Sequence, residues 1–153
     1  MTRPSQSSTL TDDLTIIRSW SFGSQGVAAA EIDTINVVIG DGASVLVAGI
    51  AAALRVDFNA YITAGYVHEF DGTSGSVSIS IDSATYAVGS APIFTSIVAS
   101  APLVIASARY GENLTLTGWT RAINRGDVLR FSITSATSIK RVLVTLRIQR
   151  LEP

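Results

Sequence analysis

Apolar and polar residues alternate with a period of two along much of the chain, which is typical of β-strands with one buried face. The alternation is clearest in four segments: LRVDF, SVSISID, VLRFSI and the run that begins at residue 142. The residues that share the apolar faces are Leu54, Val56 and Phe58; Val77, Ile79 and Ile81; Leu129, Phe131 and Ile133; and Val142, Val144, Leu146 and Ile148. We expect these faces to be buried.

Further strands are expected between and before these segments. They are predicted at residues 14–22, 34–39, 44–49, 61–70, 93–98, 103–108 and 113–117. Turn-forming sequences separate them: GDGAS at 40–44, DGTSGS at 71–76, GSAP at 89–92 and NRGD at 124–127. A helical turn is expected only at residues 27–31. This pattern predicts an all-β fold, an antiparallel β-sandwich or jelly roll.

The first thirteen residues differ from the rest, because they are rich in serine and threonine and have no apolar periodicity. They are expected to form either a flexible tail or a short extended arm that contacts a neighbouring subunit. Residues 14–153 are expected to form a single β-sandwich domain, since a chain of 153 residues is long enough for one domain with a sizeable core.

The composition favours a protein that packs against other subunits. Hydrophobic residues make up 47% of the chain and charged residues only 15%, against about 25% charged in a typical soluble domain. The net charge of −1 excludes the strongly basic surface typical of nucleic-acid binding. The chain has no cysteine, no run of 18 apolar residues and no apolar signal core, so neither disulfides nor a membrane span are expected.

Candidate catalytic residues are few. His68 is the single histidine, and no G-x-S-x-G motif accompanies it. On a regular strand over residues 61–70 it shares a face with Ile62, Ala64, Tyr66 and Phe70, which favours a structural or interface role. Glu69 and Asp71 form a carboxylate pair of the kind that glycosidases use, but Asp71 falls in a predicted turn. We therefore expect no catalytic residues, and a glycan hydrolase remains the weakest of the alternatives.

Metal and cofactor sites are not expected either. A chain with one histidine and no cysteine lacks the usual zinc ligand sets. The GDGAS and DGTSGS loops offer one aspartate each for calcium, but Asp-Gly sequences are more often plain turns. No glycine-rich phosphate-binding motif is present.

The tripeptide Arg125-Gly126-Asp127 allows two interpretations. On an exposed loop it serves cell adhesion, whereas directly before a buried strand it forms a turn. We favour the turn, because glycine permits unusual backbone angles and aspartate bonds to the local backbone.

Aromatic residues are candidates for contact with a partner. Exposed and clustered, they indicate a sugar platform or a protein interface; otherwise they belong to the core. The residues considered as sugar platforms are Trp20, Tyr61, Tyr66, Tyr86, Tyr110 and Trp119, and all of them except Tyr61 are also candidate interface residues.

The segment 114–148 resembles a pattern found in tailed-phage virion structural proteins. The matching residues are Trp119-Thr120, Ile123, Gly126-Asp127, Val128-Leu129, Ser135-Ala136-Thr137 and the final strand at 139–148. GDGASVLVAGIAAALRVDFNAYITAGYV and GSVSISIDSATY resemble earlier parts of the same domain, so that the resemblance covers roughly residues 39–149.

The resemblance implies a non-enzymatic β-sandwich module of head decoration, head-fibre or tail-fibre proteins, and a trimer. About 38 residues precede the matching region, so the shaft and anchor domains of a full-length tail fibre are not expected. The leading hypothesis is a capsid decoration (cement) protein on the surface of the phage head. Its partners would be the major capsid protein and its own copies in a homotrimer, with neither nucleic acid nor membrane. The alternative is a receptor- or glycan-binding domain of a tail or head fibre.

Overall fold

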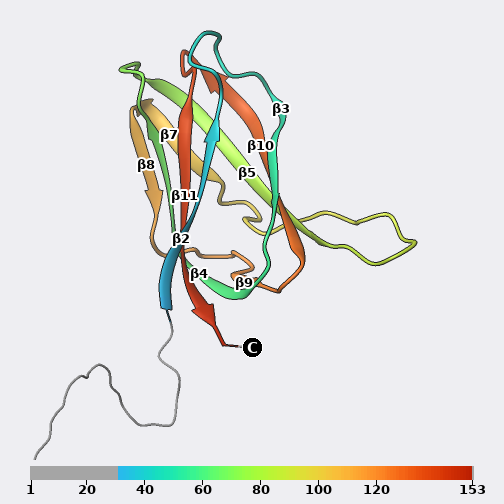
Figure 1. The fold of residues 1–153 in the computed structure, drawn as a ribbon. Coiled ribbons are helices and arrows are strands. Elements are labelled where there is room, and N and C mark those ends of the chain that lie inside the picture. The colour runs from blue at the N-terminus through green and yellow to red at the C-terminus, as the bar shows by residue number, and fades with distance from the viewer. Residues whose placement is uncertain (1–30, 153) are drawn as a thin grey trace, which may run out of the picture. The chain divides into compact units, whose positions relative to one another are not determined.

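The computed structural model describes residues 31–152, which fold into two antiparallel β-sheets packed face to face (Figure 1). The strands are β2 (Glu31–Ile39), β3 (Gly49–Arg55), β4 (Asn59–Glu69), β5 (Gly75–Thr85), β6 (Thr95–Ser96), β7 (Leu103–Ala108), β8 (Tyr110–Asn113), β9 (Ala122–Ile123), β10 (Asp127–Thr137) and β11 (Val142–Leu151). The predicted all-β sandwich is confirmed. Residues 31–152 contain no helix that is long and apolar enough to cross a membrane.

Each sheet is built around a central pair of long strands. One sheet has the order β3-β10-β5-β6, and β7 also pairs with β5. The other has the order β2-β11-β4-β8, and β9 also pairs with β4. The two ends of the described chain meet in this second sheet, because Glu31 at the start of β2 pairs with Arg150 near the end of β11.

The core lies between the sheets and consists of the apolar faces that the sequence pattern predicts. Phe131, Leu146 and Ile148 are fully buried, and all the predicted positions of the last three segments are at most 2% exposed: Val77, Ile79, Ile81, Leu129, Phe131, Ile133, Val142, Val144, Leu146 and Ile148. Val56 is also buried, while Leu54 and Phe58 are partly buried against the core. Burial of alternate side chains from both sheets therefore accounts for the period of two.

Three predicted strands differ from the structure. Residues 44–48 form a loop that crosses between the sheets, and the strand begins only at Gly49. The strand expected at 93–98 is reduced to β6. The strand expected at 113–117 ends at Asn113, because the side-chain oxygen of that residue accepts a hydrogen bond from the N–H of Leu116 at 2.9 Å and forms a turn. The predicted strand at 14–22 lies outside the described residues, as does most of the helical turn at 27–31.

A β-bulge in β4 changes which side chains point outward. Consecutive residues of β11 pair with Ala64 and Ile62, which leaves Thr63 as an extra residue. An extra residue reverses the alternation of the strand beyond it. Tyr66 and His68 therefore lie on the outer face of the sheet, and the predicted common face of Ile62, Ala64, Tyr66 and His68 is wrong.

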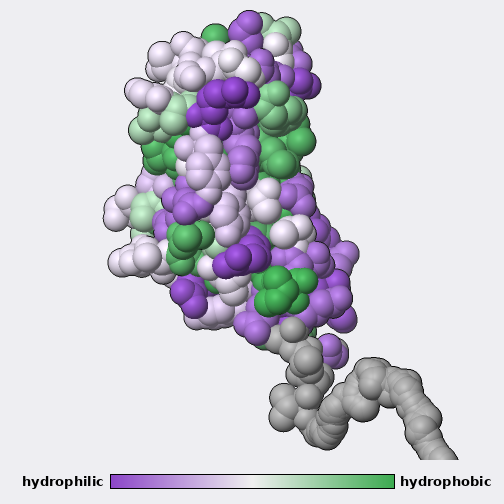
Figure 2. Space-filling model, turned by 90° about the vertical axis from the view of Figure 1, so that its left-hand side faces the viewer, coloured by the Kyte–Doolittle hydropathy of each residue, from purple (hydrophilic) through white to green (hydrophobic). Residues whose placement is uncertain are grey.

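The two sides of the sandwich differ in whether their outer strands are paired. On one side, β7 and β8 are separated by a single residue, and each pairs with a different sheet. Gly111 packs so closely here that an added Cβ would lie 1.8 Å from the carbonyl oxygen of Val104. Seen from this side, the surface mixes hydrophilic residues with separate hydrophobic ones (Figure 2). On the other side, β2 and β3 are edge strands with one unpaired edge each within residues 31–152.

Candidate functional site

The Arg125-Gly126-Asp127 sequence forms a turn that leads into β10. Gly126 has a φ of 93°, which favours glycine. The Asp127 carboxylate is buried, and it accepts hydrogen bonds from the Thr85 hydroxyl at 2.7 Å and the Asn124 backbone N–H at 2.9 Å. An adhesive site must present this carboxylate to its receptor, and here it is engaged within the fold. The turn interpretation is therefore confirmed.

The candidate carboxylate pair is held by arginines. Arg109 Nε lies 3.0 Å from Glu69 Oε1, and Asp71 forms an ion pair with Arg141. The Glu69 side chain has no exposed surface, so it cannot reach a substrate. These two acids anchor the end of β4 and do not form the open pair that glycoside hydrolysis requires.

The two Asp-Gly loops come together, but around an arginine. An added Cβ on Gly42 would lie 3.2 Å from a carboxylate oxygen of Asp71 and from the guanidinium carbon of Arg141. The positive charge of Arg141 thus occupies the place between the loops that a calcium ion would need. Residues 31–152 include no group of three or more side chains suited to hold a metal ion.

Glu69 makes the stability of the domain depend on pH. Burial raises the pKa of its carboxyl, but hydrogen bonds from the backbone N–H groups of Thr73 and Asp71, together with Arg109, hold the pKa below its ordinary value of 4.5. A lowered pKa contributes stability that is present above pH 4.5 and is lost as the pH falls through the folded-state value.

We therefore expect Glu69→Gln to destabilise the domain by about 2 kcal/mol at neutral pH, the usual loss for hydrogen bonds to a charged group. The difference from the wild type should shrink as the pH falls below 4.5. Urea unfolding of both proteins between pH 7 and pH 3 measures it. A difference that stays constant over this range would contradict the assigned role of the carboxylate.

The aromatic candidates separate into three locations. Trp119 belongs to the core at 7% exposure, and its Nε1 donates to the carbonyl of Ala101 at 2.8 Å. Its ring therefore packs within the described domain. Tyr86 is exposed in the loop between β5 and β6. Tyr66 and Tyr110 lie on the outer face of the second sheet, and Trp20 lies outside the described residues.

A second group of exposed apolar residues lines the open side of the sandwich. We call it the apolar edge, and it consists of Val45 and Val47 together with residues 49–54 of β3, which include Ile50. Val47 is 78% and Ile50 68% exposed, and no charged residue occurs between Gly42 and Leu54. The loop before β3 and the strand itself border an open groove of about 320 Å³. Natural edge strands usually carry charges that prevent pairing with other chains, so a strand without charge over residues 49–54 indicates an interaction site.

The sequence pattern did not reveal this edge. Residues 45–54 stand out as an apolar stretch, but apolar residues were expected to be buried, and a strand was predicted over 44–49. The signal that identifies the edge is the run without any charge. Near the other end of the same sheet, the loop after β5 extends away from the body (Figure 1) and exposes Val88 and Ile93.

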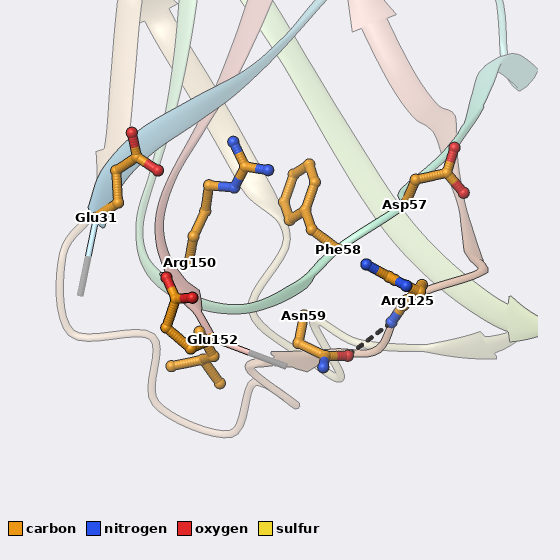
Figure 3. Close-up of a pocket in the computed structure, with 8 residues that line it drawn as sticks. Glu31, Asp57, Phe58, Asn59, Arg125, Arg150 and Glu152 are labelled. Atoms are coloured by element: carbon orange, nitrogen blue, oxygen red, sulfur yellow. Dashed lines mark hydrogen bonds between the residues drawn. The ribbon is translucent and has the colours of Figure 1, made fainter. Parts of the chain in front are cut away.

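A small polar pocket of about 220 Å³ lies where β2 begins and β11 ends (Figure 3). Arg150 packs over the ring of Phe58 at 4.2 Å and lies 3.5 Å from a carboxylate oxygen of Asp33. Arg125 also borders the pocket, with its backbone N–H bonded to the side chain of Asn59 at 2.9 Å. Three acids and two arginines share the lining, so the charges largely compensate and select no ligand class.

Comparisons with known proteins add little to this description. No family model and no curated protein matches the chain. Among solved structures, a chain of the structure of infectious bursal disease virus Gx strain aligns with 90% of this chain at 10% identity and a TM-score of 0.32. The alignment spans 41% of that chain, and a similarity this low carries no argument about function.

Proposed function

We propose that this protein is a structural, non-enzymatic component of a tailed-phage virion, and specifically a decoration protein bound to the capsid surface as a homotrimer. The observation that carries the proposal is the apolar edge. An edge strand that carries no charge before Arg55, with Ile50 exposed in it and Val47 exposed in the loop before it, favours burial against another protein chain. The resemblance of residues 39–149 to phage virion proteins supports the same role.

The proposed work of the protein is mechanical. Copies join through the apolar edge into a closed ring, since cyclic closure leaves no apolar edge unpaired. Residues 1–13 contact the major capsid protein or a neighbouring copy. Buried apolar area then resists separation of the capsid subunits at about 25 cal/mol for each Å² removed from water.

Light scattering and co-sedimentation with expanded capsids of the encoding phage test this proposal. We expect a trimer that sediments with the capsids. A chain that lacks residues 1–13 should remain folded and trimeric but lose capsid binding. The proposed decoration role would be wrong if the protein with residues 1–13 intact did not sediment with the capsids. Normal decoration by the shortened chain would remove the arm from the proposal.

A further inference from the structure

The outer face of the second sheet carries a group of aromatic and basic side chains, which we call the tyrosine face. Its members are Tyr61, Tyr66, His68, Tyr110, Arg121 and Arg147. The bulge at Thr63 creates it, because without the extra residue Tyr66 and His68 would point into the core. Tyr61 is 38% and Tyr110 45% exposed, and Arg147 and His68 are exposed as well.

Contacts within the face hold the rings in position. The guanidinium carbon of Arg121 lies 4.6 Å from the centroid of the Tyr61 ring, and that of Arg147 lies 6.0 Å from the Tyr66 ring. The His68 and Tyr110 rings are 4.7 Å apart. Side chains that are ordered before binding lose less entropy when a ligand arrives.

The face has an excess of positive charge. Within residues 31–152, five arginines have a carboxylate within ion-pair distance, and neither Arg121 nor Arg147 is among them. Glu112 pairs with Tyr66 across β4 and β8 and brings one negative charge. Two guanidinium groups without an ion-pair partner leave the face with a net positive charge beside its tyrosine rings, which complements a ligand that combines apolar ring surface with negative charge.

We infer that the tyrosine face binds an anionic saccharide. Tyrosine rings pack against the C–H faces of sugars while their hydroxyl groups stay in water. Arginine binds carboxylate or phosphate through two parallel hydrogen bonds. Tyr61 and Tyr66 are about 15 Å apart along the strand, so the ligand that bridges them is an oligosaccharide.

Other surroundings of the face favour a saccharide over a second copy of the chain. In the middle of the face the neighbouring outward side chains are polar and already linked, because the Thr145 hydroxyl donates to Asn36 at 2.7 Å and the Asn36 amide donates to Thr34 at 2.9 Å. Ile32 and Val38 of β2 are exposed apolar residues toward its two ends. The continuous uncharged run, residues 43–54, leads into and forms β3 of the other sheet. The inference is therefore independent of the proposed capsid role.

Calorimetric titration of the full-length protein tests the inference. The probes are an oligogalacturonate, which carries carboxylates, a phosphorylated mannan oligomer, and the neutral methyl ester of the oligogalacturonate. We expect at least one anionic probe to bind about tenfold or more tightly than the neutral one, as befits hydrogen bonds to a charged group. The tighter of the two anionic probes identifies carboxylate or phosphate as the natural charge.

Matched variants locate the site. Arg147→Gln and Arg121→Gln should each weaken binding about tenfold, and Tyr66→Ala should weaken it further while Tyr66→Phe retains it. Arg125→Gln removes the same charge from an exposed loop outside the face and should leave affinity unchanged. No binding of either anionic probe would overturn the inference. Equal losses in the Arg125 and Arg147 variants would also overturn it, since they indicate attraction to any polyanion.

Discussion

Replacement of Ile50 by lysine is expected to convert the assembled protein into folded monomers. Ile50 is 68% exposed in β3, so in a free subunit the new ammonium group is solvated and costs little. In an interface built on the apolar edge, the same group is buried without a partner, which costs several kcal/mol per copy. Because each copy in a ring contributes one such charge, the cost recurs at every contact.

Leu114→Lys provides the control for this change. Leu114 is 53% exposed in the loop after β8, away from β3, and receives the same charge at similar exposure. Light scattering over a range of concentrations measures the mass, and circular dichroism confirms the fold. An Ile50→Lys protein with the mass of the wild type would show that copies do not meet through the apolar edge.

Gly111→Ala is expected to destabilise the domain by at least about 3 kcal/mol. The added Cβ would lie 1.8 Å from the Val104 carbonyl oxygen and 2.8 Å from its carbon. Both atoms are backbone, so no side chain can rotate away, and β7 must separate from β8. The stability is lost because this contact joins β7 of one sheet to β8 of the other.

Gly118→Ala distinguishes this contact from the general cost of replacing glycine. Gly118 has a φ of 82° but nothing within 4 Å of an added Cβ. Its replacement should cost only about 1–2 kcal/mol, the strain of a left-handed residue. Urea unfolding of both variants measures the difference. Similar losses in the two proteins would show that β7 can move to accommodate the methyl group.

The two proposed surfaces occupy different sheets, which allows both to act at once. The apolar edge belongs to the sheet of β3, and the tyrosine face belongs to the sheet of β4. A subunit joined to its copies through β3 would still present Tyr66 and Tyr110 to a saccharide. Capsid binding and saccharide binding are thus separate measurements, and the failure of one leaves the other standing.

The sequence by itself determined the fold class and the core. Alternation of apolar and polar residues is a local property, because neighbouring side chains of a strand point to opposite faces whatever the strand pairs with. Val77, Phe131 and Leu146 are buried as this rule predicts. The turn at Gly126-Asp127 was equally predictable from the sequence, since its backbone angle and its contact with Asn124 depend on adjacent residues.

Tertiary structure decided what the surface presents. Thr63 becomes a bulge only through its pairing with β11, more than 80 residues further along the chain, as the hydrogen bond from its hydroxyl to the carbonyl of Arg147 illustrates. The outward orientation of Tyr66, the burial of Trp119 and the open edge of β3 follow from such distant pairings as well. Local periodicity determines that a strand has two faces, but only its partners determine which face and which edge meet water.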